Sequence, residues 1–489
     1  MKIKTTKTLW LVTTLLVLAL LTMTLVACGS TQTPAETTPE TTPDATTNVE
    51  GNDTTVETTP DADTQGSDEE TQAPQETEAP TEAETEAETD APTLKEQLGL
   101  EINMSDLSAA MQPIFSGNTS VNETVMFLDK GDTKSLLYPI KSVTSVTSYD
   151  GKKTYVEGTD YAVVDGKLQV LAGSSIPCIT SARYYNHSGS LINTKNPATG
   201  QMSPTFWGES QVKAWQVCVT YTHDTTWEGY TQESKLDIYQ NFIKKLQAGE
   251  DVTVFFYGDS ITWGACSSFQ ENATPKQGSY AMLVVEALAD LFDYTVKYVN
   301  TGLKDTMACA PVPSQDYVAG TRGTITYVNT AIGGWTSDNG VQKLDSFVKT
   351  PIQTYGCDLF IVAFGMNDGG GTARATASNI EKIVDGVYSV KPDAAVVLLS
   401  TMVPHNDSNW DFAAIRQQEN QLQTLAKKYR VEKEKACAVA CMTSVSKAVL
   451  EHKTFNDYSG NNINHPNDWF YRVYAQTIIQ TLIGYENMN

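Results

Sequence analysis

The sequence predicts two folded regions, an antiparallel β-sandwich over residues 94–232 and a doubly wound α/β domain over residues 233–489. In the first region, short alternating apolar runs are separated by turn residues, as is typical of antiparallel strands. In the second, continuous apolar runs alternate with helical patterns, which indicates a parallel sheet covered on both faces. Two further segments precede these regions and belong to neither.

Residues 1–28 have the composition of a secretory segment. Three lysines lie in the first seven positions, and Leu9–Val26 is almost entirely apolar. The ending at Ala27-Cys28 resembles a bacterial lipobox, in which Cys28 receives a diacylglycerol, and the small Ala27 favours cleavage over an uncleaved membrane anchor. Both alternatives predict an extracellular protein held on the bacterial cell membrane.

Residues 29–93 predict a disordered linker. They contain 18 Asp and Glu, no Lys or Arg and almost no large apolar residue. Such a composition cannot bury enough apolar surface to offset the entropy of ordering. This linker holds most of the net charge of −24, so the acidity of the chain belongs mainly to a tether and not to the folded regions. A chain with this negative charge is not expected to bind nucleic acid.

Hairpin signals support the antiparallel region. Asp165-Gly166 lies between two alternating runs within Tyr161–Val170, Asp150-Gly151 repeats the signal, and residues 214–221 alternate again. This region also holds aromatic residues that form either a sugar-stacking platform or the core of the sandwich. They are Tyr184, Tyr185, Trp207, Trp215, Trp227 and Tyr230.

An amphipathic helix is predicted over 234–248, with Gly249 as its stop. The strands predicted for the parallel sheet are Val252–Tyr257, Val296–Val299, Ile325–Val328, Asp358–Phe364, Ala395–Leu399 and Ala436–Met442. Helical patterns lie near 278–292, 373–389, 411–429, 443–452 and 467–484. In such a sheet the chemistry is expected at the carboxyl ends of the strands.

The seven cysteines after Cys28 show no zinc-type spacing. Cys437 and Cys441 lie in an apolar run and are expected to face the core. A disulfide between Cys266 and Cys309 is compatible with the count but has no support in the spacing. The sequence predicts no metal and no cofactor.

Polar and glycine residues follow three of the predicted strands. The first strand runs into Gly258-Asp259-Ser260, another ends near Gly334-Trp335, and a third ends in Gly365-Met366-Asn367-Asp368. Gly-Asp-Ser alone is an ordinary turn. Three such ends on one parallel sheet, together with the late His465, indicate a common site.

These four blocks resemble those of the SGNH (GDSL) hydrolase superfamily over about residues 250–489. The resemblance implies a flavodoxin-like fold and serine esterase chemistry. It makes Ser260 the nucleophile and His465 the base, with an oxyanion hole from the Ser260 N–H, the Gly334 N–H and the Asn367 side chain.

A segment that mimics the second block needs a separate interpretation. Tyr298–Gly302 lacks the double glycine, so it is interpreted as a strand leading into an insertion over about 303–324. The implied chemistry is physically sound, because a serine hydroxyl needs a base to take its proton and the developing oxyanion needs preorganised donors.

The acid that usually orients such a histidine is absent. Superfamily members with a full triad carry Asp three residues before the histidine, where this chain has Asn462. Asp468 is a rival orienter, although it also suits the first turn of the final helix, and Asp457 is a weaker candidate. The remaining option is a backbone carbonyl near Asn462, which gives a Ser-His dyad, and this is the hypothesis that we adopt.

Other residues at the same edge are candidates for the substrate pocket. Trp263 and Trp335 flank the site and either stack on sugar rings or pack against the sheet. His405 follows a predicted strand and can reach the pocket. His187, His223 and His452 are expected to be structural or surface residues.

The sequence therefore predicts a tethered extracellular serine esterase that removes short acyl groups, acetyl above all, from carbohydrate. The substrate class rests on resemblance to carbohydrate esterases that pair a sandwich with this catalytic fold. The alternatives are a lipase or thioesterase of the same fold, or a non-catalytic glycan-binding lipoprotein. Natural substrate and oligomeric state do not follow from the sequence.

Overall fold

The computed structural model describes residues 92–186, 192–195, 202–205, 212–406, 408, 410 and 412–489. The predicted lipobox at Cys28 and nearly all of the predicted linker lie outside these residues. Within the described part of the chain, no helix is both long and apolar enough to span a membrane.

A seven-stranded sheet forms the centre of the α/β domain, in the order β12-β11-β13-β10-β14-β15-β16. All neighbouring strands are parallel except the β11–β12 pair. The strands are β10 (Val252–Gly258), β11 (Tyr294–Tyr298), β12 (Tyr317–Val318), β13 (Gly323–Asn329), β14 (Leu359–Ala363), β15 (Ala395–Leu399) and β16 (Cys437–Ala440). Without β11 and β12 this order is flavodoxin-like, as predicted.

The edge strands agree with the interpretation of residues 298–324. β11 pairs with β13 and not with β10, so it is an additional outer strand. β12 lies within the expected insertion and pairs antiparallel with β11. The strand that lies beside β10 and leads to Gly334 is therefore β13.

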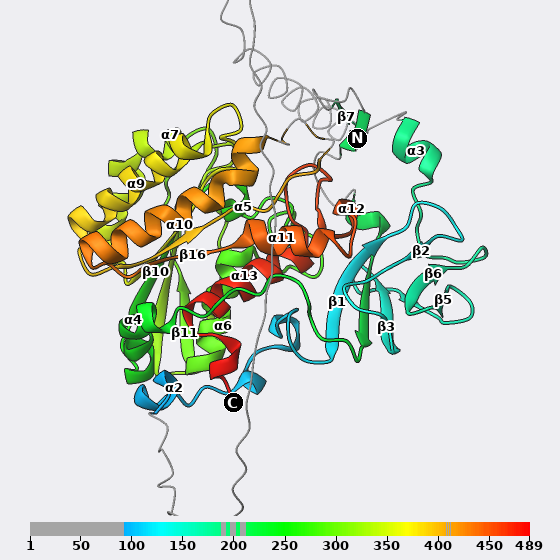
Figure 1. Ribbon diagram of the computed structural model, residues 1–489, viewed down its shortest axis with the longest axis horizontal. Helices are drawn as coiled ribbons and strands as arrows, with labels where there is room; N and C mark the ends of the chain where they lie inside the picture. Colours follow the sequence, from blue (N-terminus) through cyan, green and yellow to red (C-terminus); the bar gives the residue numbers. More distant parts are fainter. Residues whose placement is uncertain are drawn as a thin grey trace, which may run out of the picture. The chain divides into compact units, whose positions relative to one another are not determined.

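Helices cover both faces of the sheet (Figure 1). Alternate residues of β10 separate the two cores, because Val254 and Phe256 pack with one set of helices and Phe255 and Tyr257 with the other. The first set is α4 (Leu236–Ala248), α6 (Tyr280–Phe292) and α13 (Asp468–Leu482), and α9 (Ala373–Val390) and most of α10 (Ala413–Lys433) face the second core.

The sequence patterns missed the helices between β13 and β14. These are α7 (Ser337–Gln342), the π-helical η4 (Asp345–Lys349) and α8 (Thr350–Tyr355). Gly340 and Pro351 interrupt the helical periodicity there. Pro351 is tolerated because it lies in the first turn of α8.

The N-terminal region contains antiparallel sheets, as predicted. One sheet has the order β1-β9-β3-β4 and another β2-β6-β5, and β7 and β8 form a separate pair. The strands are β1 (Thr119–Met126), β2 (Thr133–Lys134), β3 (Ser142–Ser148), β4 (Thr154–Tyr155), β5 (Tyr161–Val164), β6 (Lys167–Val170), β7 (Ile192–Lys195), β8 (Met202–Thr205) and β9 (Gln216–Thr222). Asp165 and Gly166 both have positive φ, the geometry that the predicted β5–β6 hairpin requires.

Several short elements complete the fold. They are α2 (Leu94–Gln97), η1 (Met104–Asp106), η2 (Ala109–Met111), α3 (Ser181–Asn186), η3 (Lys213–Trp215), α5 (Ser260–Trp263), α11 (Met442–Leu450), α12 (Phe455–Tyr458) and η5 (Tyr485–Asn487). The segment before β1 packs on the α/β domain, since the Asn489 N–H donates to the Ile102 carbonyl and the Ile114 N–H donates to the Gln476 side chain.

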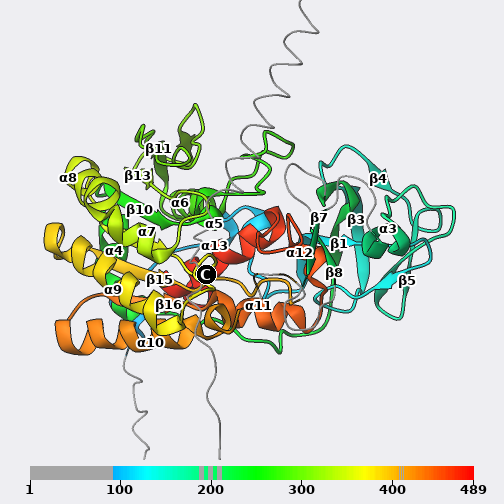
Figure 2. The same cartoon turned by 90° about the horizontal axis from the view of Figure 1, so that it is seen from above.

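Helix α13 joins the two regions. All 15 of its residues are buried, because the sheet lies on one side of it and the β1 sheet and the segment before β1 contact it on another. α12 also packs against β1, as the second view shows (Figure 2). The two regions thus share one apolar core.

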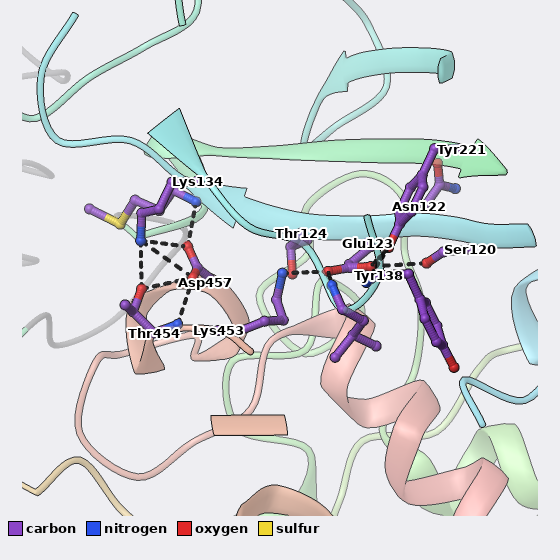
Figure 3. Close-up of polar contacts among 12 residues, drawn as sticks. Ser120, Asn122, Glu123, Thr124, Lys134, Tyr138, Tyr221, Lys453, Thr454 and Asp457 are labelled. Atoms are coloured by element: carbon purple, nitrogen blue, oxygen red, sulfur yellow. Dashed lines mark hydrogen bonds and ion pairs between the residues drawn. The ribbon is translucent and has the colours of Figure 1, made fainter. Parts of the chain in front are cut away.

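A buried ion pair crosses this junction (Figure 3). The Lys453 Nζ lies 2.5 Å from Glu123 Oε1, and neither side chain is exposed. The same carboxylate accepts from the Leu137 N–H at 2.8 Å and the Tyr221 hydroxyl at 2.8 Å. Glu123 on β1 is therefore fully hydrogen-bonded at the boundary with the α/β domain.

Asp457 on α12 forms a second polar link (Figure 3). Its carboxylate accepts from the Met126 N–H at 2.9 Å, from Lys134 Nζ at 3.3 Å and from the Thr454 N–H at 2.8 Å. These positive partners lower the pKa of Asp457 against the opposing effect of burial. Asp457 therefore belongs to the junction, and it is not the orienter of His465 considered from the sequence.

The cysteines of the described residues are all free. Cys437 and Cys441 are buried in the core, as expected. Cys266 and Cys309 form no disulfide. No group of three potential metal-ligating side chains was found among the described residues.

Removing the cation of the junction pair is expected to destabilise the protein strongly. Lys453→Met leaves the Glu123 carboxylate buried without its counter-ion, which costs about 3–5 kcal/mol of unfolding free energy. Urea unfolding measures this. The matched control is Lys141→Met, which removes an exposed partner of Asp224 and should cost less than about 1 kcal/mol. Equal losses in both variants would contradict the importance of the buried pair.

Candidate active site

Ser260 lies where β10 ends and the short helix α5 begins. The Asp259 side chain caps this helix by accepting from the Ile261 N–H at 3.0 Å, which fixes the turn. Gly258 precedes it because a Cβ there would lie 2.4 Å from the Ala363 carbonyl oxygen. The strand can thus deliver Ser260 to the carboxyl edge of the sheet without separating from β14.

Ser260 and His465 are in direct contact. The Ser260 Oγ lies 2.8 Å from His465 Nε2, although the two residues are 205 positions apart in the chain. Ser260 is 9% exposed and His465 is half-buried. Burial lowers the pKa of His465 to about 4 and raises that of Asp259 to about 7. At neutral pH His465 is therefore neutral, the state that a base requires.

The residues expected to form the oxyanion hole follow the strands on either side of β10. Gly334 comes after β13 with φ +79°, and a Cβ there would meet nothing within 4 Å. Asn367 comes after β14, and its Nδ2 donates to the Trp335 carbonyl at 2.9 Å, which leaves one amide hydrogen for a ligand. The neighbouring Asp368 accepts from the Ser337 N–H at 3.1 Å. These bonds tie the two strand ends together.

His465 projects from a closed loop. Ser459 and Pro466 form an isolated antiparallel bridge, and the Gly460 N–H donates to the His465 carbonyl at 2.9 Å. Gly460 is required here, because a Cβ would lie 2.4 Å from Cys266 Cβ. The loop therefore lies directly against the chain that follows Ser260.

Asn461 organises this loop. Its Oδ1 accepts from the backbone N–H groups of Ile463, Asn464 and His465, each at 3.0 Å. Its Nδ2 lies 3.0 Å from His465 Nδ1. The three backbone donors identify the amide oxygen, so the NH₂ group must face the ring.

The orienters considered from the sequence are therefore wrong. The Asn462 Nδ2 donates to the Tyr184 hydroxyl at 2.9 Å, and the Asp468 Oδ1 accepts from the Ser268 N–H at 2.8 Å at the start of α13. The hypothesis of a backbone carbonyl also fails within the described residues, because Nδ1 faces the Asn461 amide. The next contact of Nδ1 is the Cys266 Sγ at 3.9 Å.

This geometry has a consequence for the proton on His465. An amide N–H pointing at Nδ1 makes that atom an acceptor, so the neutral ring holds its proton on Nε2 and donates to Ser260. A base needs the opposite tautomer, with its free lone pair at Nε2. The ligand-free arrangement therefore favours the tautomer that cannot accept the serine proton.

The candidate pocket residues differ in their surroundings. Trp335 is 3% exposed and packs on Phe347 with ring centroids 4.9 Å apart, so the proposed sugar contact is wrong and the packing alternative holds. Trp263 is half-buried, and its Nε1 donates to the Ala308 carbonyl at 3.0 Å. The His405 ring contacts Phe455 edge to face, and the His405 backbone N–H donates to the Ile463 carbonyl at 2.8 Å, which braces the His465 loop.

The aromatic residues of the β region do not form an exposed platform in the described residues. Tyr184 is 5% exposed, and the Trp227 ring packs near Tyr138 and His452. His223 is also buried and stacks on Tyr138. Tyr230 is 37% exposed. His187, Trp207 and the side chain of Tyr185 lie outside the described residues.

The β region contacts the histidine loop directly, which sequence reasoning missed. The Gln216 Nε2 on β9 donates to the Asn456 carbonyl at 2.8 Å and to the Ser459 carbonyl at 2.9 Å. Tyr184 on α3 holds Asn462 from the same side. Nothing local in the sequence marks Gln216, whereas the asparagine run before His465 signals a loop with side-chain hydrogen bonds.

A flavodoxin-like α/β domain with a hydrogen-bonded Ser-His pair at the carboxyl edge of its sheet has the architecture of an SGNH hydrolase. Residues 256–473 match the model of the GDSL-like lipase/acylhydrolase family. The matched residues lie within the α/β domain.

Solved structures show similarity at low identity. They include a two-domain esterase active on acetylated mannans, co-crystallised with mannopentaose, at 20% identity and TM-score 0.35, covering 50% of this chain and 53% of that one. An acetylxylan esterase from Geobacillus stearothermophilus is similar at 17% identity and TM-score 0.33, with 50% of this chain and 99% of that one covered. A lipolytic G-D-S-L family member from Veillonella parvula is similar at 13% identity and TM-score 0.30, with 47% of this chain and 97% of that one covered.

The alignment thus spans about half the length of the two-domain esterase. These TM-scores lie below 0.5, so the similarity is no basis for assigning a substrate. A comparison with curated proteins found no match.

Supplying an acceptor for Nδ1 is expected to raise activity. In the native chain, Asn461 Nδ2 also donates to Asn464 Oδ1 at 3.0 Å. In Asn461→Asp, one carboxylate oxygen keeps the three backbone bonds and the other replaces Nδ2 beside Nδ1, once the Asn464 amide has turned its NH₂ group toward it. We expect kcat/KM for nitrophenyl acetate to rise at least about tenfold, below the roughly 10⁴-fold that separates Asp from Asn in serine proteases.

The control is Asn462→Asp, which adds the same charge one residue away but faces Tyr184. It should not raise kcat/KM. Equal effects of the two variants, or a loss in Asn461→Asp alone with the fold intact, would contradict the role of Asn461.

The pH dependence tests the burial of His465. Because its pKa is about 4, the ring gains a proton only as the pH falls through that value, so kcat/KM should be half-maximal near pH 4 instead of near 6.5. Initial rates across pH 3 to 9 measure this. Asp259→Asn removes the group that titrates near pH 7. An inflection near 6.5 that persists in this variant would show that His465 is hydrated.

Proposed function

We propose that this protein is a serine esterase that removes short acyl groups, acetyl above all, from carbohydrate through an acyl-enzyme. The observation that carries the proposal is the 2.8 Å contact between Ser260 Oγ and His465 Nε2 at the carboxyl edge of the sheet. The match of residues 256–473 to the acylhydrolase family model supports the same reaction class.

The proposed reaction has two halves. Ser260 Oγ attacks the ester carbonyl carbon while its proton passes to His465 Nε2, which requires the ring to change tautomer first. The oxyanion is stabilised by the N–H groups of Ser260 and Gly334 and by Asn367 Nδ2. As the ester C–O bond breaks, His465 gives its proton to the departing sugar oxygen, which leaves as a hydroxyl group. A water molecule that loses a proton to the same ring then attacks the acyl carbon and releases the carboxylic acid from Ser260.

The substrate class is supported by the sequence and the site together. Trp263, half-buried beside Ser260, presents an apolar ring of the kind that contacts sugar faces. The predicted tether and lipobox suit a catalyst that works on polysaccharide outside the cell, and we propose lipid anchoring through Cys28 on that ground. No partner other than such a substrate and the membrane is proposed.

The decisive experiment is acetate release from acetylated xylan and acetylated mannan by the full chain. We expect release by the native protein and a loss of about 10⁴-fold or more in Ser260→Ala. Ser267→Ala is the matched control, because its Oγ accepts from the Gln270 N–H and, among the described residues, forms no hydrogen bond with His465.

A chain-length series of nitrophenyl esters separates the alternatives. Rates that fall from acetate to longer chains support the acetylesterase, whereas rates that rise with chain length indicate a lipase or thioesterase. A folded protein whose Ser260 is never labelled by a fluorophosphonate, and which releases no acid, would leave only the non-catalytic binder.

A further inference from the structure

A cavity of about 260 Å³ lies at the junction between the β region and the α/β domain. Its walls come from the bulged part of β1, from β3 and the turn after it, from residues 275 and 277, and from the first turns of α13. Ser260 and His465 do not line it. The cavity is therefore separate from the site described above.

Two buried charged side chains from α13 line this cavity, and each has a polar atom without a hydrogen-bond partner. Arg472 is 5% exposed, and its Nη2 donates to the Asn122 carbonyl at 2.8 Å. Its buried Nε has no hydrogen-bond partner, and no ion pair involving Arg472 is recorded among the described residues. A buried guanidinium whose N–H groups are not all hydrogen-bonded is costly, because it has lost the water that would bind them.

Asp468 lies one helical turn before Arg472. It is also 5% exposed, and its Oδ1 accepts from the Ser268 N–H while the buried Oδ2 has no hydrogen-bond partner. Burial raises the pKa of Asp468 and lowers that of Arg472, so neither charge is well compensated by the protein. Buried polar atoms in folded proteins are nearly always satisfied, so these two atoms point to a missing partner.

The charged residues that line the cavity indicate which class of ligand it binds. Asp468 and Asp150 would repel an anion, and Arg472 would repel a cation. A hydroxyl group accepts from an arginine N–H and donates to a carboxylate oxygen, and adjacent hydroxyls can do both at once. The volume exceeds that of one water, about 30 Å³ in the liquid, several times over.

The cavity continues along the junction. A second cavity of about 510 Å³ shares Tyr149 and Asp150 with it and is also lined by Tyr155 and Lys152. Both tyrosines are largely buried and supply aromatic wall to the groove. Together the two cavities offer space for more than one sugar unit.

We propose that this junction groove binds a neutral oligosaccharide, with one pyranose unit held between Arg472 and Asp468. This binding does not depend on the proposed reaction at Ser260. It assigns to the boundary between the two regions a glycan site of its own, away from the ester bond.

The test is binding of xylotetraose and mannotetraose to full-length Ser260→Ala, measured by calorimetry or saturation-transfer NMR at millimolar ligand. We expect binding of at least one tetraose. Arg472→Met should lower the affinity about tenfold or more, the loss expected for one hydrogen bond to a charged group.

A second variant keeps the test valid if Arg472→Met fails to fold. Thr147 lines the cavity from β3, so Thr147→Trp should fill it and abolish binding. Thr144→Trp is the matched control, because Thr144 lies on the same strand with its side chain exposed. Melting temperatures check the fold of each variant.

The outcomes separate the possibilities. Loss of binding in Thr147→Trp with binding kept in Thr144→Trp supports the groove. Full affinity in Thr147→Trp places the sugar elsewhere and overturns the proposal. If neither tetraose binds, the proposal is overturned too. Acetate release by the native protein is measured independently, so failure of the groove and failure of the esterase are distinguishable.

Discussion

The hydrogen bonding of a buried loop is the constraint on which the site depends. The loop that presents His465 lies between two folded regions, where its backbone groups cannot reach water. Each must find a partner in the protein, because an unsatisfied buried amide or carbonyl costs as much as a lost hydrogen bond. Gln216 supplies two donors from the β region, and the Asn461 side chain supplies an acceptor for three N–H groups.

This solution couples the N-terminal region to the chemistry. The nucleophile turn belongs entirely to the α/β domain, whereas the base is held in part by residues on β9 and α3. A change in the β region can therefore move His465 relative to Ser260 without touching either. The use of Asn461 as a loop organiser also explains which end of its amide faces the ring: Oδ1 is engaged by the backbone, so the NH₂ group is the end that lies beside Nδ1.

Sequence patterns were sufficient to predict the parallel sheet and the residues that lie at its carboxyl edge. Strands such as Val252–Gly258 are apolar throughout, and glycines at 258, 334 and 365 mark the places where the chain must turn or approach closely. Asn461 was not found, because its role depends on the path of the loop and not on spacing from His465. The orientation of Trp335 was left open because a tryptophan beside a site can face the ligand or the core, and only the position of Phe347 decides between them.

The same patterns could not show how the two regions meet. Glu123 and Lys453 are 330 positions apart, and each alone looks like a surface charge. Gln216 and Arg472 likewise have ordinary local contexts. Contacts of this kind arise from tertiary packing, which a single sequence does not encode in any short segment.

Helix α13 has implications for how this sequence can vary. Most helices of globular proteins have a solvent face on which substitutions cost little. α10 has one, since only seven of its 21 residues are buried. α13 has none, so all 15 of its positions contact some other part of the molecule. A substitution in this helix must therefore be matched by compensating changes in the sheet or in the β region. The two regions are expected to change in sequence together at these positions.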